Sequence, residues 1–183
     1  NKNPQYMLTP IGAKMDLFVK QEIQDGTFVI AGGAPGGRVC WMIFGERNDP
    51  AFVDLVTELV TKIRAISYDQ LVITLSMGEQ SEATYRAWFE AGAERYLLRI
   101  ETSDPDLYRR LHPADHSWER RRDCLRLLHS IGYQLGSGVM IGLPGQSVEQ
   151  LASDILFFEN ENVVMFGMGP FIPHAHTPLR DSI

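Results

Sequence analysis

The chain has 183 residues, of which 44% are hydrophobic and 22% charged, an ordinary composition for one globular domain with a sizeable core. The net charge of −6 and the pI near 5.3 argue against non-specific binding to nucleic acid or to an anionic membrane surface. No stretch approaches the about 18 consecutive apolar residues of a membrane span. The first residues show no apolar signal region, so we expect a cytoplasmic protein with no membrane partner.

The predicted elements alternate between helices and strands. The spacing of apolar residues predicts a helix over 8–24, and a short β-branched and aromatic run predicts a strand over 27–30. Further helices are predicted over 51–65, 81–91, 118–131 and 147–161, and further strands over 71–75, 95–100, 134–141 and 163–168. Ser81 and Ser147 fit helix N-caps, and Gly132 fits a helix end.

Strict alternation of helices with five strands is typical of a parallel α/β sheet. The strands are near-continuous apolar runs, as expected when both faces of a sheet are covered. Right-handed crossovers allow a doubly wound sheet or a barrel, but no G-x-G-x-x-G follows the first strand, which weakens a dinucleotide fold. Polar residues recur at the strand ends, the rim that carries function in barrels. We therefore predict one domain, residues 1–183, that is part of a barrel.

Arg99 and Glu101 lie two apart on a predicted strand, so their side chains point to the same face. One interpretation is a buried ion pair that only sets strand register. The other is a clamp for a zwitterion, in which Glu101 accepts an ammonium group and Arg99 holds a carboxylate with a bidentate fork. Thr74 and Ser76 also share a face, and their hydroxyls suit either a ligand or the neighbouring backbone.

Three further features could carry chemistry. Glycine is dense over 136–145, which permits a close approach of backbone to ligand. Met140 in this segment suits core packing or contact with an adenine ring. The run Arg120–Arg122 opens a helix, either as a solvated face or with one arginine turned inward to hold a carboxylate. His174 and His176 lack a third partner and fit a rim loop better than a metal site.

The two cysteines, Cys40 and Cys124, lie far apart in the sequence. Their spacing indicates neither a disulfide framework nor a metal site. We expect two reduced thiols in the cytosol and no metal ligand.

Several segments together resemble the HydE-type radical S-adenosylmethionine (SAM) maturases of iron-only hydrogenase. They are Leu97-Leu98-Arg99-Ile100-Glu101-Thr102, Leu107-Tyr108, Leu111-His112-Pro113, Met140-Ile141-Gly142-Leu143-Pro144-Gly145-Gln146, Gly169-Pro170-Phe171-Ile172-Pro173-His174 and Thr177-Pro178-Leu179. The match extends from about Asp49 to Leu179, with a shorter one over 1–10. The biotin synthase and methylornithine synthase relatives share the barrel but lack a close equivalent of the segment from Gly169.

The resemblance implies a (β/α)8 barrel and an enzyme that cleaves SAM reductively at a 4Fe–4S cluster, giving a 5′-deoxyadenosyl radical. It implies a small-molecule or organometallic substrate, an iron–carbonyl–cyanide–cysteine precursor of the hydrogenase H-cluster, and other hydrogenase maturases as candidate partners. Position by position, the resemblance implies SAM contacts at Glu101, Arg121, Met140 and Ile172, and substrate contacts at Thr74, Ser76 and Arg99.

The sequence also departs from the family. Its C-x3-C-x2-C cluster loop is missing, and two cysteines cannot supply the three thiolates that the cluster needs. Ala31 and Ala34 stand where the family has a glutamine and the glutamate that follows its double glycine. We therefore expect a fragment that is inactive alone, with no catalytic residue of its own and with cluster ligands outside this chain.

Two alternatives remain open from the sequence. The chain could be part of a methylornithine synthase-like or biotin synthase-like radical SAM enzyme. It could also be a non-catalytic α/β scaffold, in which case it would ignore SAM.

Overall fold

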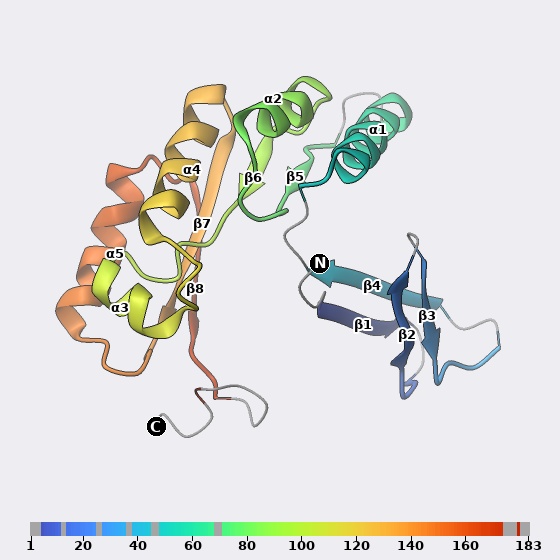
Figure 1. Ribbon diagram of the computed structural model, residues 1–183, viewed down its shortest axis with the longest axis horizontal. Helices are drawn as coiled ribbons and strands as arrows, with labels where there is room; N and C mark the ends of the chain where they lie inside the picture. Colours follow the sequence, from blue (N-terminus) through green and yellow to red (C-terminus); the bar gives the residue numbers. More distant parts are fainter. Residues whose placement is uncertain are drawn as a thin grey trace. The chain divides into compact units, whose positions relative to one another are not determined.

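The computed structural model describes residues 5–11, 14–24, 27–35, 38–44, 48–67, 71–173 and 179. The chain divides into two compact units, residues 1–47 and 48–183, which are coloured blue and green to red in Figure 1. The organisation of residues 1–183 as a single domain stays a prediction.

The first unit consists of two antiparallel strand pairs. Strand β1 (Gln5–Ile11) pairs with β4 (Arg38–Phe44), and β2 (Phe18–Gln24) pairs with β3 (Thr27–Ala31). The helix predicted over 8–24 is therefore wrong, and the strand predicted over 27–30 belongs to no parallel sheet. Aromatic and β-branched residues such as Phe18 and Val19 favour strands, and the Asp25-Gly26 pair between β2 and β3 is a hairpin signal.

The second unit is a parallel four-stranded sheet in the order β5-β6-β7-β8, with a helix in each connection. The strands are β5 (Thr74–Leu75), β6 (Arg95–Leu97), β7 (Gln134–Ile141) and β8 (Met165–Pro170). The helices are α1 (Pro50–Ser67), α2 (Glu82–Glu90), α3 (Pro105–Leu111), α4 (Trp118–Ile131) and α5 (Val148–Asn160). The parallel α/β prediction is confirmed with four strands instead of five, and α3 was not predicted.

Local sequence explains where the predicted helices begin and end. Ser81 caps α2, and Ser147 forms a capping box with Gln150 at the start of α5, which satisfies backbone N–H groups that the helix cannot. Gly132 ends α4 with φ of 115°, a left-handed conformation that glycine adopts without a steric penalty.

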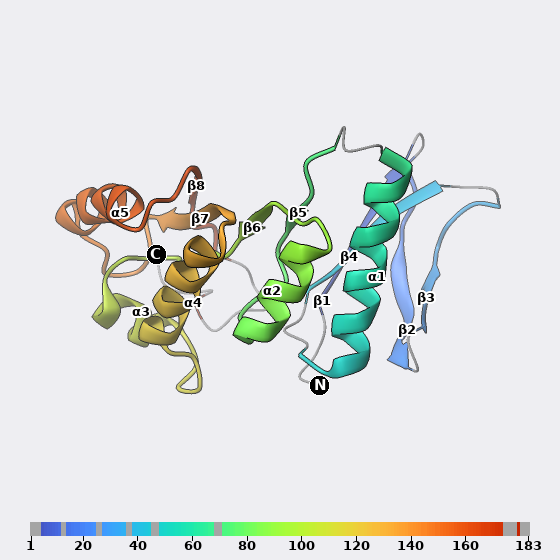
Figure 2. The same ribbon diagram turned by 90° about the horizontal axis from the view of Figure 1, so that it is seen from above.

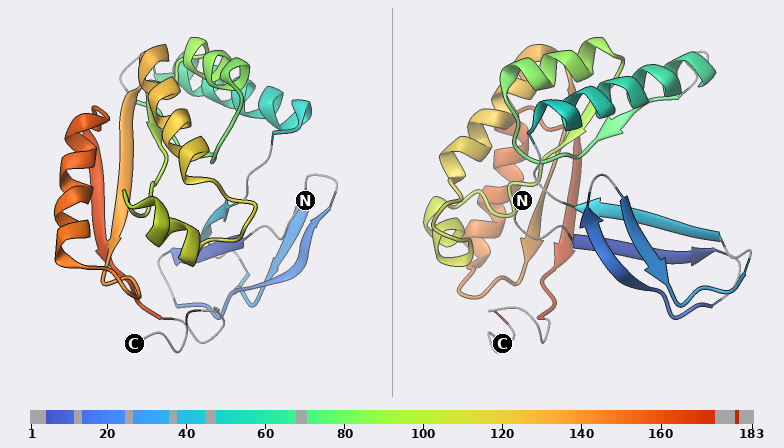
Figure 3. Two further views of the ribbon diagram at one scale, coloured as in Figure 1. Left: turned by 60° about the vertical axis from the view of Figure 1, so that its left-hand side comes forward. Right: turned by 45° about the vertical axis from the view of Figure 1, so that its right-hand side comes forward.

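The helices pack against one face of the sheet, and the opposite face carries the candidate functional site described below. Leu135 and Val139 of β7 lie in one buried cluster with Leu128 of α4 and Phe158 of α5. Because side chains alternate along a strand, Gly136, Gly138 and Met140 of β7 lie on the opposite face. Figure 2 shows α1, α2 and α4 in a row along one side of β5, β6 and β7, and Figure 3 shows α5 beside β7 and β8.

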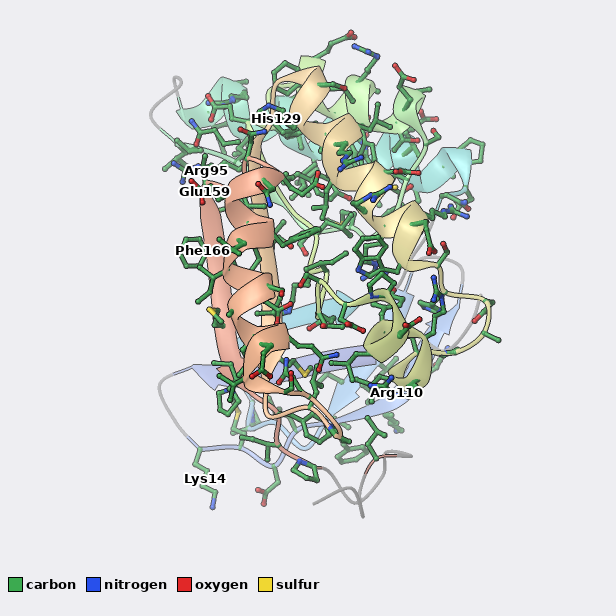
Figure 4. The ribbon with its side chains drawn as sticks, turned by 90° about the vertical axis from the view of Figure 1, so that its left-hand side faces the viewer. Lys14, Arg95, Arg110, His129, Glu159 and Phe166 are labelled. Carbon is green, nitrogen blue, oxygen red and sulfur yellow. The ribbon has the colours of Figure 1, made fainter. Side chains whose placement is uncertain are left out.

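Strand β8 is an edge, because its one partner among the described strands is β7. Its Phe166 is 62% exposed and stacks on Phe158 of α5 with ring centroids 5.1 Å apart, and Figure 4 shows Phe166 beside that helix. An open strand edge with exposed apolar side chains is a surface that natural proteins normally cover. Within the described part of the chain, no helix has the length and apolar character that crossing a membrane requires.

We expect Leu128→Ala to lower the free energy of unfolding by about 2–5 kcal/mol, because this side chain is fully buried between α4 and the sheet. Leu156→Ala, on the exposed side of α5, should cost less than about 0.5 kcal/mol. Urea unfolding followed by circular dichroism compares the two variants, and equal losses would contradict the position of the core.

Candidate functional site

Arg99 and Glu101 form an ion pair on the face of the sheet that the helices leave open. The Nε of Arg99 donates to Oε1 of Glu101 at 3.0 Å, and its Nη2 donates to the carbonyl oxygen of Val139 at 3.0 Å. Ile100 between them is fully buried in the core on the helix side. The two charged groups therefore share the face that the sequence predicted, although regular strand β6 ends at Leu97.

The glycines of β7 and β8 make room for the guanidinium of Arg99. A Cβ atom on Gly138 would lie 2.5 Å from Nη1 of Arg99 and 2.7 Å from the carbonyl oxygen of Gly167. Both distances are too short for any side chain, so residue 138 has to be glycine for Arg99 to lie there. The glycine residues of β7 and β8 thus allow the guanidinium of Arg99 to lie directly on the strand backbone.

Glu101 combines backbone strain with an unused oxygen. Its φ is 65°, a left-handed conformation that costs a non-glycine residue about 1–2 kcal/mol. Its N–H donates to Gly138 O at 2.9 Å and its carbonyl accepts from Met140 N at 3.0 Å, which maintains this conformation. Its Oε2 is buried and has no hydrogen-bond partner among the described residues. A buried carboxylate oxygen without a partner is suited to a cationic ligand group.

Arg121 reaches the pair from helix α4. Its Nε donates to Oε1 of Glu79 at 2.9 Å, and its Nη1 donates to the carbonyl of Arg99 at 3.1 Å. The side chains of Arg121 and Glu79 are only 12% and 8% exposed, and Glu79 also pairs with Arg120 at 2.9 Å. Arg121 is therefore the inward arginine of the 120–122 run. The sequence places Glu79 among the polar residues at the strand ends, but no role in the site was predicted for it.

Two tyrosine hydroxyls hold the loop that carries Glu79. The hydroxyl of Tyr96 donates to Gly78 O at 2.9 Å and accepts from Met77 N at 3.2 Å. The hydroxyl of Tyr85 accepts from Gln80 N at 2.9 Å. Burial raises the pKa of Tyr85, so its hydroxyl stays protonated at neutral pH. The aromatic core thus fixes the rim of the sheet directly.

Met140 lies on the same face as Gly138, because the two are two residues apart on β7. The turn that follows is closed by Gln146. Its Oε1 accepts from Gly142 N at 2.7 Å and Leu143 N at 3.2 Å, and its Nε2 donates to Met140 O at 3.0 Å. The backbone around Met140 is therefore fixed on both sides.

For the other predicted site residues, the structure describes no side-chain hydrogen bond to Arg99, Glu101 or Arg121. Thr74 and Ser76 are exposed while Leu75 between them is buried, so both hydroxyls lie on the helix-free side of β5. The structure describes no hydrogen bond from either hydroxyl. Ile172 is 77% exposed and follows Phe171, whose N–H donates to Ile141 O at 2.8 Å at the end of the β7–β8 pairing. His174 and His176 lie outside the described residues.

His112 lies against the same charged groups. Its ring stacks on Tyr108 with centroids 3.7 Å apart, and its Nδ1 lies 3.0 Å from Tyr108 O. Burial lowers the pKa of His112 and outweighs the hydrogen bond to the Tyr108 carbonyl, which raises it. The positive charge of Arg121 lowers the pKa further, and the negative charge of Glu101 raises it. The imidazole is therefore neutral at pH 7 and donates from Nδ1 to the carbonyl.

The comparisons with known proteins identify the family. Residues 19–158 match the Radical SAM superfamily. The chain belongs to this superfamily. It is 46% identical over 141 residues to the [FeFe] hydrogenase maturase subunit HydE of Thermotoga maritima, an alignment that covers 76% of this chain and 39% of that protein. The resemblance to HydE-type radical SAM proteins is thus confirmed.

Relatives with other printed names are more distant. The chain is 25% identical over 162 residues to 3-methylornithine synthase of Methanosarcina acetivorans, covering 88% of this chain and 45% of that protein. The crystal structure of methylornithine synthase (PylB) matches with a TM-score of 0.64 and 27% identity, covering 73% of this chain and 39% of that one. The chain spans less than half the length of these relatives. The predicted fold, part of the α/β barrel of radical SAM enzymes, is confirmed by these matches.

The superfamily implies SAM and a 4Fe–4S cluster, and this chain's residues fit the two differently. The unpartnered Oε2 of Glu101 suits the ammonium group of SAM. The sequence holds two cysteines, and Cys124 is a free thiol buried in α4. No group of three potential metal ligands gathers among the described residues. The described site therefore fits the amino-acid end of SAM and does not fit the cluster.

We expect the free energy of unfolding to fall as the pH drops below about 6.5, the ordinary pKa of histidine. The unfolded chain binds a proton to His112 there before the folded chain does, so protonation favours unfolding until the pH passes the lower folded-state pKa. His112→Asn should have a smaller slope in urea unfolding between pH 7 and 5. Equal slopes in both proteins would contradict the assignment, and an NMR titration of His112 checks the direction independently.

Proposed function

We propose that this chain forms the SAM-binding part of a HydE-type maturase that assembles the [FeFe]-hydrogenase cofactor in the cytoplasm. The observation that carries the proposal is the buried, unpartnered Oε2 of Glu101 beside Arg99 and Arg121, at the strand ends where α/β barrels bind ligands. When bound, SAM supplies the 5′-deoxyadenosyl group. The cluster that would reduce SAM needs ligands that these residues do not provide.

Glu101 and Arg121 bind the amino-acid end of SAM in this proposal. Glu101 accepts the ammonium group with Oε2, while its Oε1 stays on Arg99. Arg121 is oriented by Glu79, donates to the carbonyl of Arg99, and in this proposal complements the carboxylate. Met140 and Ile172 offer apolar contacts to the adenosine end, from β7 and from the residues that follow β8.

Arg99, Thr74 and Ser76 bind the substrate's carboxylate in this proposal. Arg99 is 36% exposed although it pairs with Glu101, so its guanidinium remains accessible from the open face of the sheet. The hydroxyls of Thr74 and Ser76 have no partner in the described structure and can donate to the same carboxylate. An organometallic precursor that carries an amino acid fits this set, with other maturases as the proteins that deliver or receive it.

A second candidate is a methylornithine synthase-like reaction, favoured by the structural match to PylB. Both candidates use an amino-acid carboxylate, so the Arg99 pocket does not separate them. The identity of 46% to HydE against 25% to 3-methylornithine synthase favours the maturase.

We expect Glu101→Gln to weaken SAM binding by about 1–3 kcal/mol, because glutamine removes the charged acceptor and leaves a buried amide in its place. This loss corresponds to a rise in the dissociation constant of about 5- to 150-fold. Isothermal titration of the chain with SAM measures it. Glu82→Gln, an exposed acid on α2, is the matched control and should bind like the unchanged protein. Unchanged affinity in Glu101→Gln would remove this residue from the site.

We expect Arg99→Lys to leave SAM affinity within about threefold and to weaken capture of an amino-acid carboxylate by about tenfold or more. Lysine keeps a positive charge that can pair with Oε1 of Glu101, so Glu101 stays in place, but a single ammonium group cannot also bind a carboxylate with two parallel hydrogen bonds. Titration with SAM and, separately, with L-cysteine as the carboxylate probe measures both effects. A loss of SAM affinity with unchanged cysteine affinity would reverse the assigned roles.

A further inference from the structure

Asp154 is a fully buried carboxylate in the middle of helix α5, and the described residues supply no cation to pair with it. Its side chain is 0% exposed, and it forms no ion pair with any Lys, Arg or His that the structure describes. Burial raises the pKa of Asp154, which is the usual sign of a carboxylate held where its charge is poorly solvated. Burial of an acid without a cationic partner lowers the stability of the folded chain, so the hydrogen bonds of the carboxylate have to offset this cost.

One contact of Asp154 is with the loop that carries Glu101. Its Oδ1 accepts a hydrogen bond from the backbone N–H of Ser103 at 2.6 Å. Ser103 lies two residues after Glu101, whose left-handed backbone needs support from its surroundings. Thr102 between them is fully buried, and its carbonyl accepts from Trp118 Nε1 at 3.1 Å.

The other contact of Asp154 is with the turn that follows Met140. Its Oδ2 lies 3.5 Å from Nε2 of Gln146, a polar contact longer than the about 2.7–3.2 Å of a typical N–H···O hydrogen bond. That same Nε2 donates to Met140 O, while Oε1 of Gln146 holds Gly142 N and Leu143 N. One carboxylate thus touches the supports of both loops.

We propose that Asp154 is a positioning residue that joins loop 101–104 to turn 140–146 and so sets the distance between the two ends of the SAM site. This inference rests on the proposed function, because Glu101 and Met140 are there the contacts for the amino-acid and adenosine ends. Asp154 touches neither end of the ligand itself. Each of its two oxygens faces a donor from a different loop, whereas an amide in its place would present one acceptor oxygen and one donor nitrogen.

The chemistry of the side chain makes Asp154→Asn a sharp test. The amide that replaces the carboxylate can accept from Ser103 N with its oxygen, but its nitrogen then faces Nε2 of Gln146, donor against donor. Glu161→Gln is the matched control, since Glu161 is also a buried acid next to α5 but pairs with Arg126 at 2.6 Å, away from both loops. Gln146→Leu is the second variant. It removes the contact with Asp154 together with the bonds of Gln146 to Gly142 N, Leu143 N and Met140 O, and it leaves the bond that Ser103 N donates to Asp154.

The experiment measures amide hydrogen exchange by mass spectrometry and NMR, together with SAM titration, on the unchanged chain and the three variants. We expect Asp154→Asn to speed exchange at Ser103 and at Gly142 and Leu143, and to raise the SAM dissociation constant by about tenfold or more. Gln146→Leu should speed exchange at Gly142 and Leu143 only and also weaken SAM binding. Glu161→Gln should lower the melting temperature while leaving both loops and the SAM affinity within about twofold.

Several outcomes would overturn the inference. They are faster exchange confined to α5 or spread evenly over the sheet in Asp154→Asn, or SAM affinity within about twofold of the unchanged chain. If Asp154→Asn does not fold, SAM affinity within about twofold of the unchanged chain in Gln146→Leu overturns it equally, because freeing the turn would then leave the SAM site unchanged. Absence of SAM binding to the unchanged chain would instead sink the proposed function, and the exchange arms would still decide whether Asp154 joins the two loops.

Discussion

The site depends on one packing constraint, the guanidinium of Arg99 lying on the bare backbone of β7 and β8. A Cβ atom at position 138 would clash with Nη1 of Arg99, so the guanidinium can lie there only because residue 138 is glycine. With Arg99 held there, Glu101 can pair through Oε1 and keep Oε2 unbonded. A larger residue at position 138 would displace Arg99 and, with it, the partner that orients Glu101.

Around this pair, every described support comes from the second unit. The hydroxyls of Tyr85 and Tyr96 fix the loop of Glu79, and Glu79 in turn orients Arg121 toward the carbonyl of Arg99. The aromatic core therefore also supports the loop after β5, because the hydroxyl groups of its tyrosines form hydrogen bonds with the loop backbone. A substitution deep in this core would alter the site even though it contacts no ligand.

Much of the second unit could be predicted because local rules and tertiary structure agree there. Helix α4 and strand β7 occupy the predicted residues, and the shared face of Arg99 and Glu101 follows from a period of two. The left-handed conformation of Glu101 could not be predicted, since it depends on hydrogen bonds to β7 from a distant part of the chain. The roles of Glu79 and Asp154 could not be predicted for the same reason, because each forms hydrogen bonds with groups that are far away in the sequence.

The first unit shows where periodicity misleads. Apolar residues over 8–24 have helical spacing, yet residues 8–11 belong to strand β1 and residues 18–24 form strand β2. Spacing alone does not distinguish the two structures in a short window, and the β-branched residues and the Asp25-Gly26 signal carried more information.

In the proposed function, binding of SAM and its cleavage depend on different groups. The groups that would hold the ammonium and carboxylate of SAM are supported by contacts within residues 48–183, whereas the two cysteines of the sequence are too few for a cluster. Charge complementarity at Glu101 and Arg121 does not require the cluster, although the cluster would add to affinity when present. A measurement of binding therefore reports on these residues directly, without the redox chemistry that the superfamily performs.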